Sequence, residues 1–171
     1  MDANFPRALA ALLQSEGGYS DDARDPGGVT NLGVTKNVWE EWVRHPVTAR
    51  DMKRLTIKDV TPLYRRKYWN RVNADALPSG LDYAVFDAAV NSGPGRAVKW
   101  LQAVLDVPES GVVDAATLDA MSDWKLPQLI TAYNATRLAF LYTLPTWGTF
   151  GNGWTNRIVR LTDTASKMTE L

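Results

Sequence analysis

Apolar residues recur at intervals of three and four along most of this chain, and this helical spacing constrains its fold more than any other feature. Phe5, Leu9 and Leu12 begin the pattern, so a helix is predicted over residues about 5 to 16, where Gly17 and Gly18 follow. Strand-like alternation is sparse. The sequence therefore predicts a mainly α fold with at most a small β-hairpin.

Turn and capping residues divide the rest of the chain. Residues 19–33 are rich in Asp, Gly and Asn, which predicts an irregular loop or a hairpin near residues 28 to 34. Thr35 precedes an apolar stripe, and the pairs Thr48/Asp51 and Thr56/Asp59 resemble capping boxes that open two more helices. Apolar stripes predict later helices over about 81–90, 98–105, 114–121, 130–142 and 156–168, with a glycine-rich aromatic loop over 147–154.

Length and composition fit one globular unit. The 171 residues are 45% hydrophobic and 22% charged, which is ordinary for a protein that folds alone. We expect a single monomeric domain, with residues about 94–171 packed on residues about 1–93. No stretch has the roughly 18 apolar residues of a membrane helix and no secretion signal is recognisable, so we expect synthesis in the cytosol without membrane insertion.

The residue inventory removes several kinds of chemistry. The chain has no cysteine and one histidine, His45, so thiolate nucleophiles, zinc sites and histidine-based triads are not expected. We predict no metal and no cofactor, and carboxylates must carry any hydrolysis. The formal net charge of zero argues against nucleic acid as a partner. The segment 64–71 mixes cations with aromatics, and either a polyanion contact or, as we favour, a helix with one wet face explains it.

Glu16 is the strongest candidate for such a carboxylate. It lies at the predicted C-terminal end of the first helix, where the helix dipole disfavours a negative charge. Partial burial there would raise the pKa of Glu16 and keep it protonated, as a general acid must be. Glycoside hydrolysis usually needs a second oxygen group across the scissile bond, and Asp25 and Thr30 follow on the next loop. A plain turn over residues 25–28 explains Asp25 equally well.

Several blocks of this sequence resemble one known family. Residues 16–19 (Glu-Gly-Gly-Tyr) and 25–35 are similar to the signature of glycoside hydrolase family 108, the muramidases of bacteriophages and prophages. Each block alone is a weak indication of the family, but the two together at this spacing are a strong one. Similar later blocks follow in the family's order and extend the resemblance over nearly the whole chain: Tyr64 with Tyr68-Trp69, residues 87–93, Leu101-Gln102 and residues 150–157.

The resemblance implies an α+β, lysozyme-like domain that hydrolyses the bond between N-acetylmuramic acid and N-acetylglucosamine in bacterial peptidoglycan. It implies Glu16 as the catalytic residue. A fainter resemblance to phage-type lysozymes, which share the eight-residue gap from Glu16 to Asp25, suggests that Asp25 and Thr30 position water; Thr30 comes one residue sooner than in that pattern. The candidate substrate contacts are Tyr19, Asn31, Trp69, Asn91 and Trp154.

Two other functions stay open at this point. A lone Glu16 would also suffice for a lytic transglycosylase, which closes an anhydro ring without water, and a non-catalytic wall-binding module would need no acid. Residues 95–121 are partly similar to a peptidoglycan-binding segment, although we favour structural helices there. The family also implies an endolysin that stays in the bacterial cytoplasm until a holin-type pore admits it to the wall.

Overall fold

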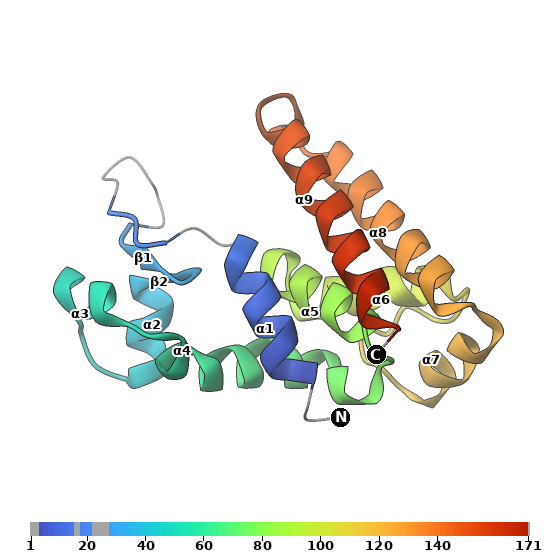
Figure 1. Cartoon of the computed structure of the whole chain (residues 1–171), viewed down its shortest axis with the longest axis horizontal. Coiled ribbons are helices and arrows are strands. Elements are labelled where there is room, and N and C mark those ends of the chain that lie inside the picture. Colours follow the sequence, from blue (N-terminus) through green and yellow to red (C-terminus); the bar gives the residue numbers. More distant parts are fainter. Residues whose placement is uncertain (1–3, 16–17, 22–27, 171) are drawn as a thin grey trace. The chain divides into compact units, whose positions relative to one another are not determined.

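The computed structural model describes residues 4–15, 18–21 and 28–170 (Figure 1). The chain divides into two compact units, one of residues 9–67 and one of residues 1–8 with 68–171. The predicted boundary near residue 93 falls inside the second unit, because the helices on either side of it share one core. The fold is mainly α with one small antiparallel hairpin, as predicted.

Helix α1 (Asn4–Ser15) begins one residue before the predicted start and carries the apolar stripe expected of it. Phe5, Ala8, Leu9 and Leu12 are all buried. Glu16, the predicted catalytic residue, lies outside the described residues.

The unit of residues 9–67 holds the hairpin and three short helices. Strands β1 (Thr30–Asn31) and β2 (Val34–Thr35) pair antiparallel, with Thr30 opposite Thr35. The Tyr64 hydroxyl donates to the Leu32 carbonyl at 2.9 Å and ties the turn to the last of the helices. These helices are α2 (Lys36–Val43), α3 (Ala49–Arg54) and α4 (Ile57–Tyr64).

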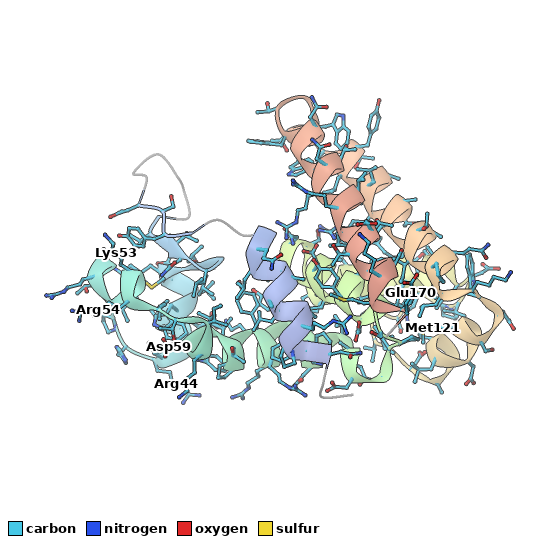
Figure 2. The ribbon with its side chains drawn as sticks, in the orientation of Figure 1. Arg44, Lys53, Arg54, Asp59, Met121 and Glu170 are labelled. Carbon is cyan, nitrogen blue, oxygen red and sulfur yellow. The ribbon has the colours of Figure 1, made fainter. Side chains whose placement is uncertain are left out.

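The predicted caps open all three helices. The Thr35 hydroxyl accepts from the Val38 amide at the start of α2. The carboxylate of Asp51 accepts from the amide of Thr48, and that of Asp59, labelled in Figure 2, accepts from the amide of Thr56, at 2.8 Å in both cases. Each bond satisfies a backbone donor that the helix itself leaves unpaired.

The larger unit is built around one buried helix, α5 (Leu81–Ser92), in which residues 81–89 are all buried. A helix buried on every side lies at the centre of a core. Helices α6 (Pro94–Val104), α8 (Leu126–Tyr142) and α9 (Trp147–Met168) pack around it. The shorter elements are η1 (Arg65–Trp69, a π-helical turn), η2 (Asn70–Val72), η3 (Ala74–Ala76), α7 (Ala115–Ala120) and η4 (Met121–Asp123).

Helix α9 begins at Trp147, so the loop predicted over residues 147–154 is wrong. Three glycines lower the helix propensity of this segment, but tertiary contacts override propensity. The Trp147 ring lies 5.1 Å from the ring of Tyr142 at the end of α8. It also lies 6.1 Å from the ring of Trp154, about two helical turns further along α9. Gly151 leaves the space that the Trp147 ring occupies, because a Cβ there would lie 2.6 Å from it.

Among the helices of the described residues, none is long and apolar enough to span a bilayer.

Candidate functional site

The β1–β2 turn fixes the position of Thr30, one of the predicted water-binding residues. Leu32 and Gly33 form the turn with φ values of 50° and 70°, and this left-handed pair matches the twist of a two-residue hairpin. Leucine rarely adopts such a conformation, which costs on the order of 1 kcal/mol or more. The Tyr64 hydroxyl bond to the Leu32 carbonyl helps to hold it.

Thr30 has a hydroxyl that is available to accept hydrogen bonds. Its backbone pairs with Ser20 through two bonds of 2.9 Å, so the residues before the hairpin join its edge. The Thr30 hydroxyl donates to the Gly28 carbonyl at 3.2 Å. Because that bond uses the hydroxyl proton, the oxygen lone pairs can receive a hydrogen bond from water. Asp25, its predicted partner, lies outside the described residues.

Two predicted substrate contacts lie in or next to the hairpin: Asn31 belongs to β1, and Tyr19 precedes Ser20, which pairs with Thr30. Tyr19 is half-buried, donates to Asp21 at 3.2 Å and lies under the Lys53 ammonium, 5.5 Å from the ring centroid. Asn31 is only 6% exposed, and its amide donates to the Met52 carbonyl at 2.8 Å. Asn31 therefore ties the hairpin to α3, whereas Tyr19 keeps part of its ring accessible.

Trp69 is a core residue rather than an accessible stacking platform. It is fully buried, and its ring centroid lies 5.2 Å from that of Phe5 and 5.4 Å from that of Phe86. Its indole N–H donates to Asp75 at 2.9 Å. A sugar ring has no free face of Trp69 to stack on in this structure.

Asn91 and Trp154, the other two predicted contacts, meet at one pocket in the larger unit. The pocket has a volume of about 220 Å³. The Asn91 amide donates back to the Asp87 carbonyl at 2.8 Å, so it belongs to α5 rather than capping its end, where Gly93 serves. Helices α5, α6, α8 and α9 and the turn after α8 line the pocket with Asn91, Ser92, Arg96, Arg137, Phe140, Leu141, Leu144, Trp154, Arg157 and Ile158.

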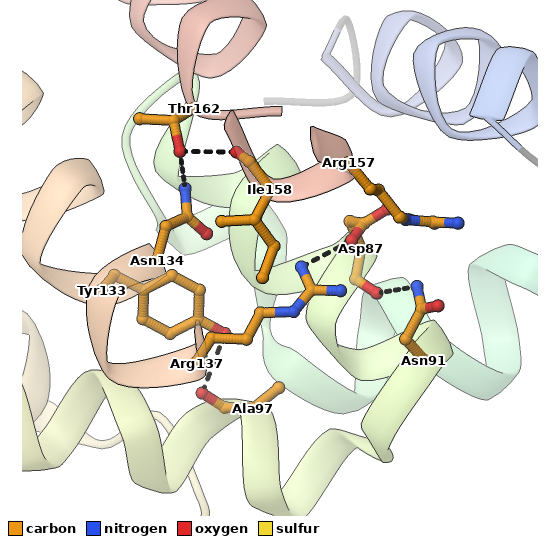
Figure 3. Close-up of polar contacts among 9 residues, drawn as sticks. All are labelled: Asp87, Asn91, Ala97, Tyr133, Asn134, Arg137, Arg157, Ile158 and Thr162. Carbon is orange, nitrogen blue, oxygen red and sulfur yellow. Dashed lines mark hydrogen bonds and ion pairs between the residues drawn. The ribbon is translucent and has the colours of Figure 1, made fainter. Parts of the chain in front are cut away.

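Two arginines that line this pocket, Arg137 and Arg157, belong to a charge cluster around Asp87 (Figure 3). The Asp87 carboxylate, 1% exposed, accepts from Arg137 at 2.6 Å and from Arg157 at 2.7 Å. Arg137 is itself buried, with its side chain 3% exposed. Burying a carboxylate is costly unless charges and hydrogen bonds compensate it, and these two arginines supply both.

Two tyrosines border the charge cluster without being ionised near neutral pH. Burial, together with the nearby Asp87 carboxylate, raises the pKa of Tyr83 to about 12. Burial also raises the pKa of Tyr133. The Tyr133 hydroxyl donates to the Ala97 carbonyl at 3.1 Å and so joins α8 to α6 beside the pocket. Both side chains are therefore neutral near pH 7.

The sequence reasoning missed Asp87, Arg96 and Arg137. A carboxylate inside the apolar stripe of residues 81–90 signals a buried ion pair, because an isolated buried charge is not tolerated. Its partners are not local, since Arg137 lies 50 positions away and Arg157 lies 70. Periodicity within one helix therefore cannot identify them.

Residues 95–121, which are partly similar to a wall-binding segment, contain a buried glutamine with a structural role. Gln102 is fully buried, and its amide nitrogen lies 2.9 Å from the Ser110 hydroxyl, 2.9 Å from the Val112 carbonyl and 3.1 Å from the Thr117 hydroxyl. Its carbonyl accepts from the Gly111 amide. Gln102 thus anchors the loop between α6 and α7.

Comparison with known proteins finds a matching family model and similar solved structures. The sequence model described as Glycosyl hydrolase 108 matches residues 9–93, a range that includes Glu16, Asp25 and Thr30. The structure of SagA from Brucella abortus is 40% identical in sequence, covering 99% of this chain and 97% of that one, with a TM-score of 0.87. No curated protein matches at a significant level.

Proposed function

The chain belongs to the glycosyl hydrolase 108 family and is a glycoside hydrolase that acts on peptidoglycan; we propose that it is a lysozyme-type N-acetylmuramidase with Glu16 as its general acid. The bond that we assign to it is the β-1,4 link between N-acetylmuramic acid and N-acetylglucosamine. The family match over residues 9–93 carries the proposal, because the Glu16 to Thr30 segment lies inside it.

The proposed reaction needs only side chains of this protein and water. Glu16 donates its proton to the glycosidic oxygen, and the bond from that oxygen to the anomeric carbon breaks. A water held by Asp25 and Thr30 adds to the opposite face of the oxocarbenium-like sugar and loses its proton to Asp25. The Thr30 hydroxyl supports this role, because it donates to Gly28 and keeps its lone pairs for water.

The remaining substrate contacts follow from accessibility. Tyr19 lies beside the Thr30 edge of the hairpin, through the Ser20–Thr30 pairing, and we propose that its ring contacts a sugar. Asn91 and Trp154 line the pocket of the other unit, and we propose that they contact a second part of the polymer. We assign Asn31 and Trp69 to the framework, because hydrogen bonds and ring contacts within the protein already engage them.

Glu16→Gln tests the proposal directly. On purified, lipid-stripped peptidoglycan we expect the folded variant to lose lysis, by about a hundredfold or more, since an amide cannot serve as the acid. Glu109→Gln, at an exposed carboxylate in the other unit, is the matched control and should lyse normally. Retained lysis by Glu16→Gln would refute the assignment, and no lysis by the unmodified protein would favour a wall-binding module.

A further inference from the structure

Positively charged side chains line the pocket that Asn91 and Trp154 border. Three guanidinium groups, those of Arg96, Arg137 and Arg157, line it, and those of Arg137 and Arg157 both pair with the carboxylate of Asp87. Of the described residues that line the pocket, none is acidic. An anion entering the pocket would therefore meet Arg96, whose guanidinium forms no ion pair with a described residue.

The pocket also has a buried hydrogen-bond donor that is not paired with any described residue. The Nε of Arg137 is buried and has no hydrogen-bond partner among the described residues, although the same guanidinium donates to Asp87 through Nη1. Buried donors are normally paired, so an unmet one beside a pocket indicates a group that the protein itself does not supply. Arg96 is exposed and stacks on the Phe140 ring, with 4.6 Å from the guanidinium carbon to the ring centroid, which leaves its fork of N–H groups open.

The shape of the pocket selects a small anion with an apolar body. Its volume of about 220 Å³ is below the roughly 300–1,000 Å³ of pockets for drug-sized ligands, so it accepts a residue-sized group and not a pair of sugars. Phe140, Leu141 and Ile158 give it apolar walls beside the cations. Planar guanidinium groups bind carboxylates through paired hydrogen bonds. Helix α6, which begins at Pro94 two residues before Arg96, adds its positive end.

We propose that this pocket is a carboxylate-binding subsite that receives an amino-acid carboxylate of the peptide stem of peptidoglycan, with Arg96 as its accessible ligand. The identification of the stem rests on the proposed function, since peptidoglycan carries its carboxylates on short peptides attached to the muramic acid. The subsite lies apart from the proposed acid in sequence and makes stem-bearing glycan a better ligand than bare glycan.

Binding of a defined fragment tests the subsite without cleavage. In calorimetric titrations at low salt, N-acetylmuramyl-L-alanyl-D-glutamate should bind the full-length protein, and its diamide, in which both carboxylates are neutral, should bind at least about tenfold more weakly. Arg96→Gln should weaken binding of the acid by about the same factor. Arg160→Gln, which removes an exposed arginine of α9 outside the pocket, is the matched control and should bind the acid normally.

Each alternative result overturns the subsite. Absence of binding by the acid, equal binding of acid and diamide, or unchanged binding in Arg96→Gln would each contradict it, as would displacement of the acid by an equal concentration of inorganic phosphate. The titration does not depend on Glu16. If the unmodified protein lyses peptidoglycan but does not bind the acid fragment, only the subsite is refuted. If it binds the acid fragment but does not lyse peptidoglycan, only the muramidase activity is refuted.

Discussion

Asp87 shows how one residue organises the larger unit. Its carboxylate is 1% exposed and receives one arginine from α8 and another from α9, so a single side chain of α5 joins three helices. A buried ion pair of this kind gains little over an apolar contact, but breaking it is expensive because the remaining charges stay buried. The same cations line the pocket, so Asp87 also holds the proposed subsite in place.

Replacing Asp87 by Asn should therefore destabilise the protein strongly. The amide keeps the size of the side chain but leaves Arg137 without a counter-charge, and we expect a loss of about 3–5 kcal/mol in the free energy of unfolding. Urea denaturation followed by circular dichroism measures it. Asp119→Asn, at an exposed position of α7, provides the baseline and should change stability little. Equal stability of the two variants would show that the cluster is not a structural support.

At the scale of elements, the first turns of α9 depend on one glycine and tolerate another. Gly151 is buried, and an added Cβ would lie 2.6 Å from the Trp147 ring, whereas Gly153 has nothing within 4 Å. Alanine improves helix propensity at both positions by up to about 1 kcal/mol. Only at Gly151 must the Trp147 ring move, away from its contacts with Tyr142 and Trp154.

The two alanine variants should consequently change stability in opposite directions. We expect Gly153→Ala to raise the free energy of unfolding by about 0.5–1 kcal/mol and Gly151→Ala to lower it by about 1–3 kcal/mol, the usual cost of overpacking. Thermal melts of both proteins give the comparison. Stabilisation by both substitutions would mean that the Trp147 ring is not fixed against Gly151.

The capping boxes give α3 and α4 a dependence on pH. Hydrogen bonds from the Thr48 hydroxyl and amide lower the pKa of Asp51, and those from Thr56 lower that of Asp59. A carboxyl with a lowered folded-state pKa stabilises the fold above its ordinary pKa of 3.8, and this stabilisation disappears as the pH falls through the folded-state value.

A double variant isolates this contribution. Asp51→Asn/Asp59→Asn should have a lower urea midpoint than the unmodified protein near pH 7, and the two midpoints should converge as the pH falls below the ordinary carboxyl pKa and through the lowered folded-state pKa values, where the natural carboxyls also become neutral. A difference that stays constant across this range would mean that the caps act through shape alone and not through charge.

At the scale of the whole molecule, the sequence predicts what is local and misses what is not. The helical stripes and the Thr35, Thr48 and Thr56 caps are written within a few residues, and the structure has all of them. The start of α9 was misplaced because contacts with Tyr142 outweigh three glycines. The Asp87 cluster joins positions 50 and 70 residues apart, and no periodicity within a helix encodes that pairing.

The proposed catalytic segment and the proposed carboxylate subsite belong to different compact units of the chain. The Glu16 to Thr30 segment belongs to the unit of residues 9–67, and the arginine-lined pocket belongs to the unit of residues 1–8 and 68–171. We therefore expect acid catalysis and stem recognition to be separable by mutation, with Glu16→Gln affecting cleavage and Arg96→Gln affecting affinity. The family match ends at residue 93, before most of the pocket.

The most direct test of the account is the chemical identity of the cleavage product. Peptidoglycan digested by the unmodified protein, reduced with borohydride and analysed by mass spectrometry should yield fragments that end in reduced N-acetylmuramic acid, each carrying one added water, and Glu16→Gln should yield none. Fragments that end in 1,6-anhydro-muramic acid, which borohydride does not reduce and which are therefore lighter than the reduced fragments by one water and two hydrogens, would contradict the hydrolytic mechanism. Reducing ends on N-acetylglucosamine would contradict the assigned bond.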